Sequence, residues 1–465
     1  MKRLIYSFAL LMLAVMPASA QNDELAIKAS IVDKAGTDVS AQHPKTESAP
    51  DIVDKPYSER IIYESINAKG EKIYLSAMVY IPSPWDVPDS DVLISHIILN
   101  CHPTVTSNYE APTGAGAIDK DINRICGVHD SWDLYTDSYT MVVCPDYCGY
   151  GISSYEQHPY LIHDITAINC IDAVRAAIYL AAEKGRLSTK GYDTQIVGYS
   201  QGGATALACT KYLESDGCRQ SLKDFINLRE TVCGDGPYSA PATVGKYLEW
   251  GTPAEYGGED RDLEYPCVLP LIVQAAKAAY DDGCMHTVEI EDFFSETFLS
   301  TGILDLLKTK VTNTNDLNNE IAKKMPRRRP VDVFSSNIIN PDGTFNTTTN
   351  QYKCLMRALE MGDLTKGWEP QHPITFYHLP NDGVVPYANF EEAKKGFGTN
   401  KKHIRFIEAE DAHSASGLIT WFDLICSMQG ISDPDFENTN HADGGTLFYV
   451  DFLFGDQIRK KDWWK

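Results

Sequence analysis

The chain has 465 residues, with 41 basic and 64 acidic side chains that give a formal net charge of −23. Apolar residues make up 43% of it, which is typical of a folded chain; its length allows one large domain with insertions or two to three smaller ones. The acidic excess argues against nucleic-acid binding, which needs a basic surface to displace counterions, and against general attraction to anionic membranes.

Residues 1–20 have the pattern of a secretory signal peptide. Lys2 and Arg3 form a basic start, the stretch from Leu4 to Met16 is apolar, and small residues lead up to a cleavage site after Ala20. The apolar stretch is too short to cross a membrane, and we find no later apolar run of about 18 residues. We therefore expect the mature protein to be secreted or periplasmic and to have no membrane span.

Export would make disulfides possible, and all 12 cysteines lie beyond residue 20. Buried free thiols are expected where cysteines lie in apolar stretches, namely at Cys101, Cys144 and Cys209. Loop-like surroundings favour bridges between Cys218 and Cys233 and between Cys267 and Cys284. The sequence has no Cys-x-x-Cys or His-x-x-x-His pair. We therefore expect no structural zinc site, no other metal and no cofactor.

Strand-like and helix-like segments alternate along the chain after a polar N-terminal segment at residues 21–55. Apolar patterns predict strands at 72–81, 96–101, 139–144, 195–197, 231–233, 374–379 and 404–407. Apolar residues at helical spacing predict a helix over 163–184, and an alanine-rich stretch predicts another over 204–213. This alternation indicates an α/β fold with a mostly parallel sheet covered by helices. In such sheets, functional residues lie beyond the carboxyl ends of the strands.

Residues 239–369 interrupt the alternation, and we expect them to form a helical cap insertion. They contain an apolar run at 268–280 and an aromatic and apolar stretch at 293–307. The core is then divided into a first part, 56–238, and a second part, 370–465. The insertion leaves the sheet just after residues 236–237 and returns just before the expected strand 374–379, so we expect it to cover the strand ends. A rigid layer that only completes the core is the alternative.

The sequence Gly198-Tyr199-Ser200-Gln201-Gly202 matches the G-x-S-x-G pattern of a nucleophile elbow. The pattern alone is weak, but here an expected strand precedes it and an expected helix follows it. The glycines are needed because the serine lies on a sharp, strained turn. The turn presents Ser200 Oγ at the start of a helix, where the backbone N–H of Gln201 can face a developing oxyanion. An inert serine in a glycine-rich turn is the alternative.

A serine nucleophile needs a histidine base and a carboxylate that orients it, in the chain order serine, acid, histidine for this type of elbow. His413 follows the expected strand 404–407 after a short acidic loop, and we predict it to be the base. His441, in a polar loop, is the remaining alternative. Asp382 ends the preceding strand and is the predicted acid, with Asp235 as the alternative.

The oxyanion hole needs a second N–H donor besides that of Gln201. Thr104 follows the expected strand 96–101, and Asp146 follows the strand 139–144. Both stand at carboxyl ends of strands, and the spacing of the residues does not choose between them.

The chain resembles the α/β-hydrolases, and within them the secretory lipases of the fungal lipase A type. The matching pieces are PDYCGYG at 145–151, GYSQGGA at 198–204 and GDGP at 234–237, completed by Asp382 and His413. The resemblance spans roughly residues 60 to 430 and is loose in the cap insertion. It implies an α/β-hydrolase fold, a lid formed by that insertion, and an oxyanion hole that pairs Asp146 with Gln201. Gln201 stands where that family often has glycine.

These residues predict a secreted serine hydrolase that cleaves carboxylic esters through an acyl-enzyme on Ser200, as a lipase or esterase. Its partner would be a small-molecule or lipid ester. The alternatives are a serine peptidase of the prolyl-oligopeptidase type, which the lack of propeller repeats disfavours, and a carbohydrate acyl esterase. A non-catalytic binding protein on the same scaffold is disfavoured by the complete set of serine, acid and histidine.

Overall fold

The computed structural model describes residues 57–81, 93–117, 138–183, 191–218, 220–279, 284–400, 402–410 and 439–454. The predicted signal peptide and the polar segment at 21–55 lie outside these residues.

The described residues form one eight-stranded sheet with the order β1-β2-β4-β3-β5-β6-β7-β8. The strands are β1 (Tyr57–Ile66), β2 (Lys72–Ile81), β3 (Leu93–Cys101), β4 (Ser138–Pro145), β5 (Tyr192–Tyr199), β6 (Ile226–Gly234), β7 (Ile374–His378) and β8 (Ile404–Glu408). β2 pairs antiparallel with β1 and β4, and every other neighbouring pair is parallel. The predicted strands are confirmed, and β1 is an addition to them.

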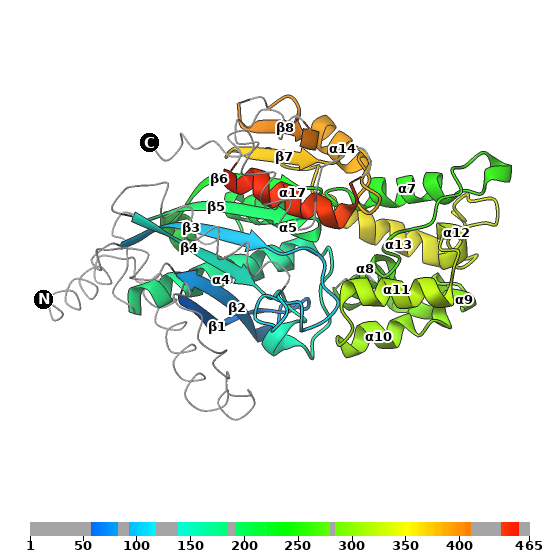
Figure 1. The fold of residues 1–465 in the computed structure, drawn as a ribbon, viewed down its shortest axis with the longest axis horizontal. Helices are drawn as coiled ribbons and strands as arrows, with labels where there is room; N and C mark the ends of the chain where they lie inside the picture. The colour runs from blue at the N-terminus through cyan, green and yellow to red at the C-terminus, as the bar shows by residue number, and fades with distance from the viewer. Residues whose placement is uncertain are drawn as a thin grey trace, which may run out of the picture.

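Helices cover both faces of this sheet (Figure 1). On one face, apolar residues of the strands pack with those of α4 (His163–Glu183), α5 (Gln201–Glu214) and α14 (Ala388–Phe397). On the other face, they pack with α17 (His441–Phe454). Neighbouring residues of β5 show the alternation, because Ile196 belongs to the first cluster and Val197 to the second. The central strands are therefore buried on both faces, as a parallel sheet requires.

The cap insertion lies between β6 and β7, and its described residues hold helices and turns. The longer helices are α7 (Ala240–Gly251), α8 (Val268–Ala279), α10 (Ile303–Thr309), α11 (Thr314–Lys324) and α13 (Asn350–Met361), with the single turns α9 (Glu296–Leu299) and α12 (Pro330–Val333) between them. Figure 1 shows these helices gathered to one side of the sheet. Their apolar side chains form a hydrophobic cluster of their own, which also takes in Tyr160, Leu161 and Ile162 of the core.

One disulfide joins Cys284 to Cys354, and it ties a turn that follows α8 to helix α13. The two predicted bridges are wrong. Cys233 belongs to the buried strand β6, and Cys218 and Cys267 are also buried free thiols. The free thiols expected at Cys101, Cys144 and Cys209 are confirmed. No helix in the described ranges has the length and apolar character needed to cross a bilayer.

Candidate active site

Ser200 lies on a strained turn between β5 and α5. Its backbone has φ 58° and ψ −127°, which is unusual for a residue other than glycine. The turn is tight enough to demand glycine on both sides. A Cβ on Gly198 would lie 2.2 Å from the carbonyl oxygen of Gly202, and a Cβ on Gly202 would lie 1.9 Å from that of Cys101. The Ser200 N–H donates to the carbonyl of Gly234 on β6 at 2.9 Å, which fixes the turn to the sheet.

Ser200, His441 and Asp382 form one hydrogen-bonded chain. His441 Nε2 lies 2.8 Å from Ser200 Oγ, and His441 Nδ1 lies 2.5 Å from an oxygen of Asp382. The ionised carboxylate only accepts hydrogen bonds, so Nδ1 carries the proton and Nε2 is free to accept one from the serine hydroxyl. All three side chains are buried. This arrangement is the geometry of a serine nucleophile with its base and orienting acid.

The contact with Ser200 is made by His441, the alternative to the predicted base His413. His413 lies outside the described residues, in the stretch 411–438. The position beside Ser200 is occupied by His441, the first residue of α17. α17 packs on the face of the sheet opposite α4, α5 and α14, and His441 stands at its start. The polar residues before His441 predict a loop; the apolar run from Leu447 onward was the available sign that a helix begins there.

The Asp382 carboxylate is held by its own loop as well as by the imidazole. Its second oxygen accepts the backbone N–H groups of Val384 at 2.7 Å and Val385 at 2.8 Å. Burial opposes ionisation, but the charge and hydrogen bond of His441 prevail and lower the pKa of Asp382 below its ordinary value. Burial likewise disfavours the imidazolium, but Asp382 raises the pKa of His441 above its ordinary value. The pair is therefore built to stabilise a protonated imidazole.

Asp235, the alternative acid, belongs to a second buried pair. Its carboxylate lies 2.9 Å from His378 Nδ1 and accepts the backbone N–H of Leu379 at 2.8 Å. These contacts join the end of β6 to the end of β7, directly before the loop that carries Asp382. Asp235 thus supports the acid loop, and Asp382 is the carboxylate that contacts the base.

Of the two candidates for the second oxyanion donor, the structure removes Asp146. Its backbone N–H donates to the carbonyl of Ser76 at 3.0 Å, so it is not available to a substrate. Its carboxylate accepts hydrogen bonds from the hydroxyl of Ser76 at 2.5 Å and from the hydroxyl and N–H of Thr113 at 2.6 and 2.8 Å. Asp146 therefore fastens the loop after β4 to β2 and to the segment after β3. The resemblance to lipases had suggested the opposite choice.

Thr104 follows the segment that contacts the nucleophile turn. Residues 101 and 102 place their carbonyl oxygens against Gly202, and Thr104 follows two residues later. Its hydroxyl is paired with that of Tyr160 at 2.9 Å, which leaves its backbone N–H as the group of interest. Within the described residues we find no acceptor for that N–H. Thr104 remains the candidate for the second donor.

The side chain of Gln201 is fixed by a histidine that sequence analysis did not single out. Its Nε2 lies 2.8 Å from His158 Nε2, while His158 Nδ1 donates to the carbonyl of Cys148 at 2.8 Å. Burial lowers the pKa of His158 to about 3, so the ring is neutral and its Nε2 accepts from the Gln201 amide. The contact turns the Gln201 side chain toward the core loops. The backbone N–H of Gln201, in the first turn of α5, has no acceptor within that helix.

The cap insertion contacts the acid loop directly. The hydroxyl of Tyr247 on α7 donates to the carbonyl of Val384, two residues after Asp382. A small apolar cavity also lies between the cap insertion and the core, lined by side chains of α7, α8 and α13 and by Tyr160, Leu161 and Ile162. The cap insertion therefore touches both the triad loop and the segment that carries Tyr160.

Neither a protein-family model nor a curated protein sequence matches this chain. Solved structures do. The rice cell wall degrading esterase LipA from Xanthomonas oryzae aligns with a TM-score of 0.57 and 21% identity over 81% of this chain and 88% of LipA. A Legionella pneumophila protein described only by inference as a hydrolase aligns with a TM-score of 0.58 and 18% identity, over 87% and 89% of the two chains. Lipase A from Candida antarctica aligns with a TM-score of 0.48 and 16% identity, over 82% and 80%. At these identities the likeness concerns the fold, and it confirms the predicted α/β-hydrolase fold.

Proposed function

We propose that this chain, on its α/β-hydrolase fold, cleaves carboxylic esters through a covalent acyl-enzyme on Ser200. The observation that carries the proposal is the continuous hydrogen-bonded chain from Ser200 Oγ through His441 to Asp382. A serine hydroxyl is a weak nucleophile unless an adjacent base takes its proton. His441 is placed to do so, and Asp382 is placed to stabilise the imidazolium that results.

The reaction follows from this geometry in two halves. In the first, Ser200 Oγ bonds to the ester carbonyl carbon while its proton passes to His441 Nε2. His441 then gives that proton to the leaving alcohol as the carbon–oxygen ester bond breaks. In the second half, a water molecule loses a proton to His441, attacks the acyl-enzyme and releases the acid. The proton returns to Ser200, so the enzyme ends as it began.

The charge that develops on the carbonyl oxygen needs donors that point at it. The backbone N–H of Gln201 stands at the start of α5, directly after the nucleophile. We place the N–H of Thr104 opposite it as the second donor. The buried contact between Gln201 and His158 supports this hole, because it holds the residue that supplies the first donor.

The substrate class rests on the fold neighbours together with the triad. LipA from Xanthomonas oryzae is a cell wall degrading esterase, which favours the carbohydrate acyl ester among the alternatives. The apolar side chains of the cap insertion, which contacts the acid loop through Tyr247, favour a lipid ester as the other candidate. We therefore propose both carbohydrate acyl esters and lipid esters as substrates. A peptidase activity is the alternative. The leader-like sequence at residues 1–20 supports export as the setting in which such esters are met.

The test is an ester panel run with the wild-type chain and Ser200→Ala. p-Nitrophenyl esters of increasing acyl length, an acetylated oligosaccharide and an aminoacyl-prolyl amide would be offered side by side. We expect ester turnover that Ser200→Ala abolishes, and covalent labelling of Ser200 by a fluorophosphonate. Amide cleavage with no ester cleavage would replace the proposal with a peptidase. A wild-type chain that neither turns over an ester nor takes the label would point to a binding protein.

A further inference from the structure

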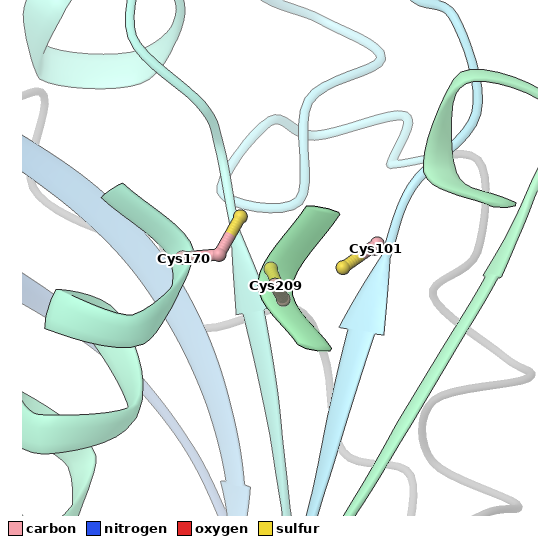
Figure 2. Close-up of side chains that lie close together, drawn as sticks. All are labelled: Cys101, Cys170 and Cys209. Atoms are coloured by element: carbon pink, nitrogen blue, oxygen red, sulfur yellow. The ribbon is translucent and has the colours of Figure 1, made fainter. Parts of the chain in front are cut away.

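Three cysteine side chains meet in the core directly beneath the nucleophile turn. Cys101 ends β3, Cys170 lies on α4 and Cys209 lies on α5. Figure 2 shows the three side chains coming together from these elements. Their sulfur atoms all lie within 4.8 Å of one another, and all three residues are fully buried. In the described part of the chain, no other group of three or more histidine, cysteine or acidic residues comes as close together.

Ordinary packing does not require this convergence. A buried free cysteine usually acts as a small apolar side chain, and this protein has others in its core, such as Cys233. In the cluster, by contrast, the sulfur atoms of Cys101, Cys170 and Cys209 all lie within 4.8 Å of one another. None of the three cysteines is in a disulfide. Three thiols that face each other in a closed apolar space share the donor type and the spacing of a metal site.

The spacing can be compared with what a metal ion needs. Metal–sulfur bonds to thiolates are about 2.3 Å long, so three sulfurs arranged evenly in a plane around one ion lie about 4 Å apart. The observed limit of 4.8 Å admits that arrangement with little movement. Thiolate sulfur is a soft ligand that favours Cu(I) and Zn(II) over magnesium, calcium or manganese.

We propose that Cys101, Cys170 and Cys209 form a three-sulfur site for one thiophilic ion, with Cu(I) as the chemistry that the site fits best. A structural zinc ion takes four ligands, and the cluster offers three. Binding replaces thiol protons, which pass to solvent, with metal–sulfur bonds; no oxidation is involved. Sequence analysis expected no metal, because the three residues are far apart in the chain and form no short ligand motif.

The site would act on the fold of the active site without joining the reaction. The carbonyl of Cys101 faces Gly202 in the nucleophile turn, and Cys209 lies two turns along the helix that begins after Ser200. An ion bound here would link β3, α4 and α5 to each other. It would therefore raise thermal stability, since it binds the folded chain and finds no preformed site in the unfolded one. The inference does not depend on the proposed ester chemistry.

The experiment is a metal titration of the full chain, purified under reducing, oxygen-free conditions. Cu(I), buffered by a coloured chelator, and Zn(II) would be added in separate arms. We expect one equivalent of Cu(I), an ultraviolet thiolate-to-metal absorption and a higher melting temperature. Cys170→Ala and Cys209→Ala should each weaken Cu(I) binding by at least about tenfold. The matched control Cys233→Ala removes a neighbouring buried free thiol that is outside the three-sulfur group, and it should bind as the wild type does.

Several results would overturn the proposal. The proposal fails if no equivalent of Cu(I) binds, or if Cys233→Ala loses as much Cu(I) affinity as the cluster variants. It also fails if peptide mapping finds a disulfide among the three cysteines. A single equivalent of Zn(II) that is held more tightly than Cu(I) would contradict the choice of ion. Should the alanine variants fail to fold, X-ray absorption on the copper-loaded wild type decides the question. It must show about three sulfur neighbours at about 2.3 Å, and a different ligand set refutes the site.

Discussion

The imidazole of His441 is held at both nitrogen atoms, and this fixes what each of them does. Asp382 accepts from Nδ1, so Nε2 faces Ser200 without a proton. The hydroxyl of Tyr199 adds a hydrogen bond to the backbone carbonyl of His441 at 2.8 Å. The base is thus fixed in its tautomer by a carboxylate and in its position by a backbone contact.

Substitution of the base is the most direct test at the scale of single residues. We expect His441→Ala to lower kcat/KM for a p-nitrophenyl ester by about 10⁴-fold, because the serine then loses its proton acceptor. The matched control is His413→Ala, which should stay within about tenfold of wild type. Circular dichroism would show that both variants are folded. A large loss in His413→Ala with a small one in His441→Ala would return the role to His413.

The pH dependence of kcat/KM should reflect the pKa of His441 and its contact with Asp382. Only neutral His441 can accept the serine proton, so kcat/KM is lost as the pH falls through the pKa of His441 in the free enzyme. Asp382 raises the pKa of His441 despite burial, so the acidic limb should lie above the range of an ordinary histidine. In Asp382→Asn, no carboxylate raises the pKa of His441. The limb should move to lower pH, and the rate should fall by about 10⁴-fold. An unmoved limb would show that the titrating group is a different one.

The sequence pointed to residues that directly follow one strand. It did not reveal contacts between segments that are far apart in the chain. Ser200 and Asp382 each follow a strand closely, and the structure brings them to one imidazole. The choice between His413 and His441 depended on the path of the chain after β8, which no local pattern records. Asp146 was misjudged because the partner of its N–H, Ser76, belongs to a strand about seventy residues away.

At the scale of elements, the joint between β5 and α5 depends on contacts that leave no room for a side chain. The carbonyl of Cys101 at the end of β3 approaches Gly202 so closely that the two segments touch through their backbones. A shift of β3 would therefore move the turn that carries Ser200.

Two glycine substitutions compare this joint with an open helix position. Gly202→Ala should lower the free energy of unfolding by more than about 1 kcal/mol and reduce ester turnover, because its Cβ would collide with the Cys101 carbonyl. Gly245→Ala, on α7, has no atom within 4 Å of the added Cβ. It should raise stability by about 0.5–1 kcal/mol, since alanine loses less conformational freedom in a helix. Chemical denaturation measures both; similar effects in the two variants would show that the close approach is relieved by movement.

The elements themselves were largely predictable because their patterns are local. The alternation in 72–81 and the helical spacing in 163–184 are patterns of neighbouring residues, and β2 and α4 form there. β1 was missed although Ile61, Tyr63 and Ser65 are buried at alternate positions, because the apolar stretch is short and has charged residues on both sides, at 59, 60 and 64. The disulfide pairing was not predictable, since Cys284 meets Cys354 only after α13 has packed against the turn that follows α8.

At the scale of the whole molecule, the cap insertion and the core are separate hydrophobic clusters joined through a few contacts. The cap insertion has its own apolar interior and its own disulfide, whose cysteines are 70 positions apart in the sequence. A crosslink of that span stabilises chiefly by restricting the unfolded chain.

Loss of that crosslink should therefore weaken the cap insertion more than the core. We expect Cys354→Ala to lower the free energy of unfolding of the cap insertion by about 2–4 kcal/mol. Limited proteolysis should then cut within residues 239–369 sooner than in the wild type, while short esters are still hydrolysed. Cys267→Ala, a buried free thiol in the same insertion, separates the lost crosslink from the lost side chain. Equal cleavage of the two variants would show that the bridge contributes little.

The place of His441 along the chain has a consequence for synthesis. Ser200 and Asp382 are made before it, and the histidine contacts them only when α17 has packed its Phe448 against Tyr199 and Gly234. A ribosome-bound chain that stops short of α17 carries a nucleophile and an acid but no base. The proposed mechanism therefore requires α17 to dock before the chain can hydrolyse an ester.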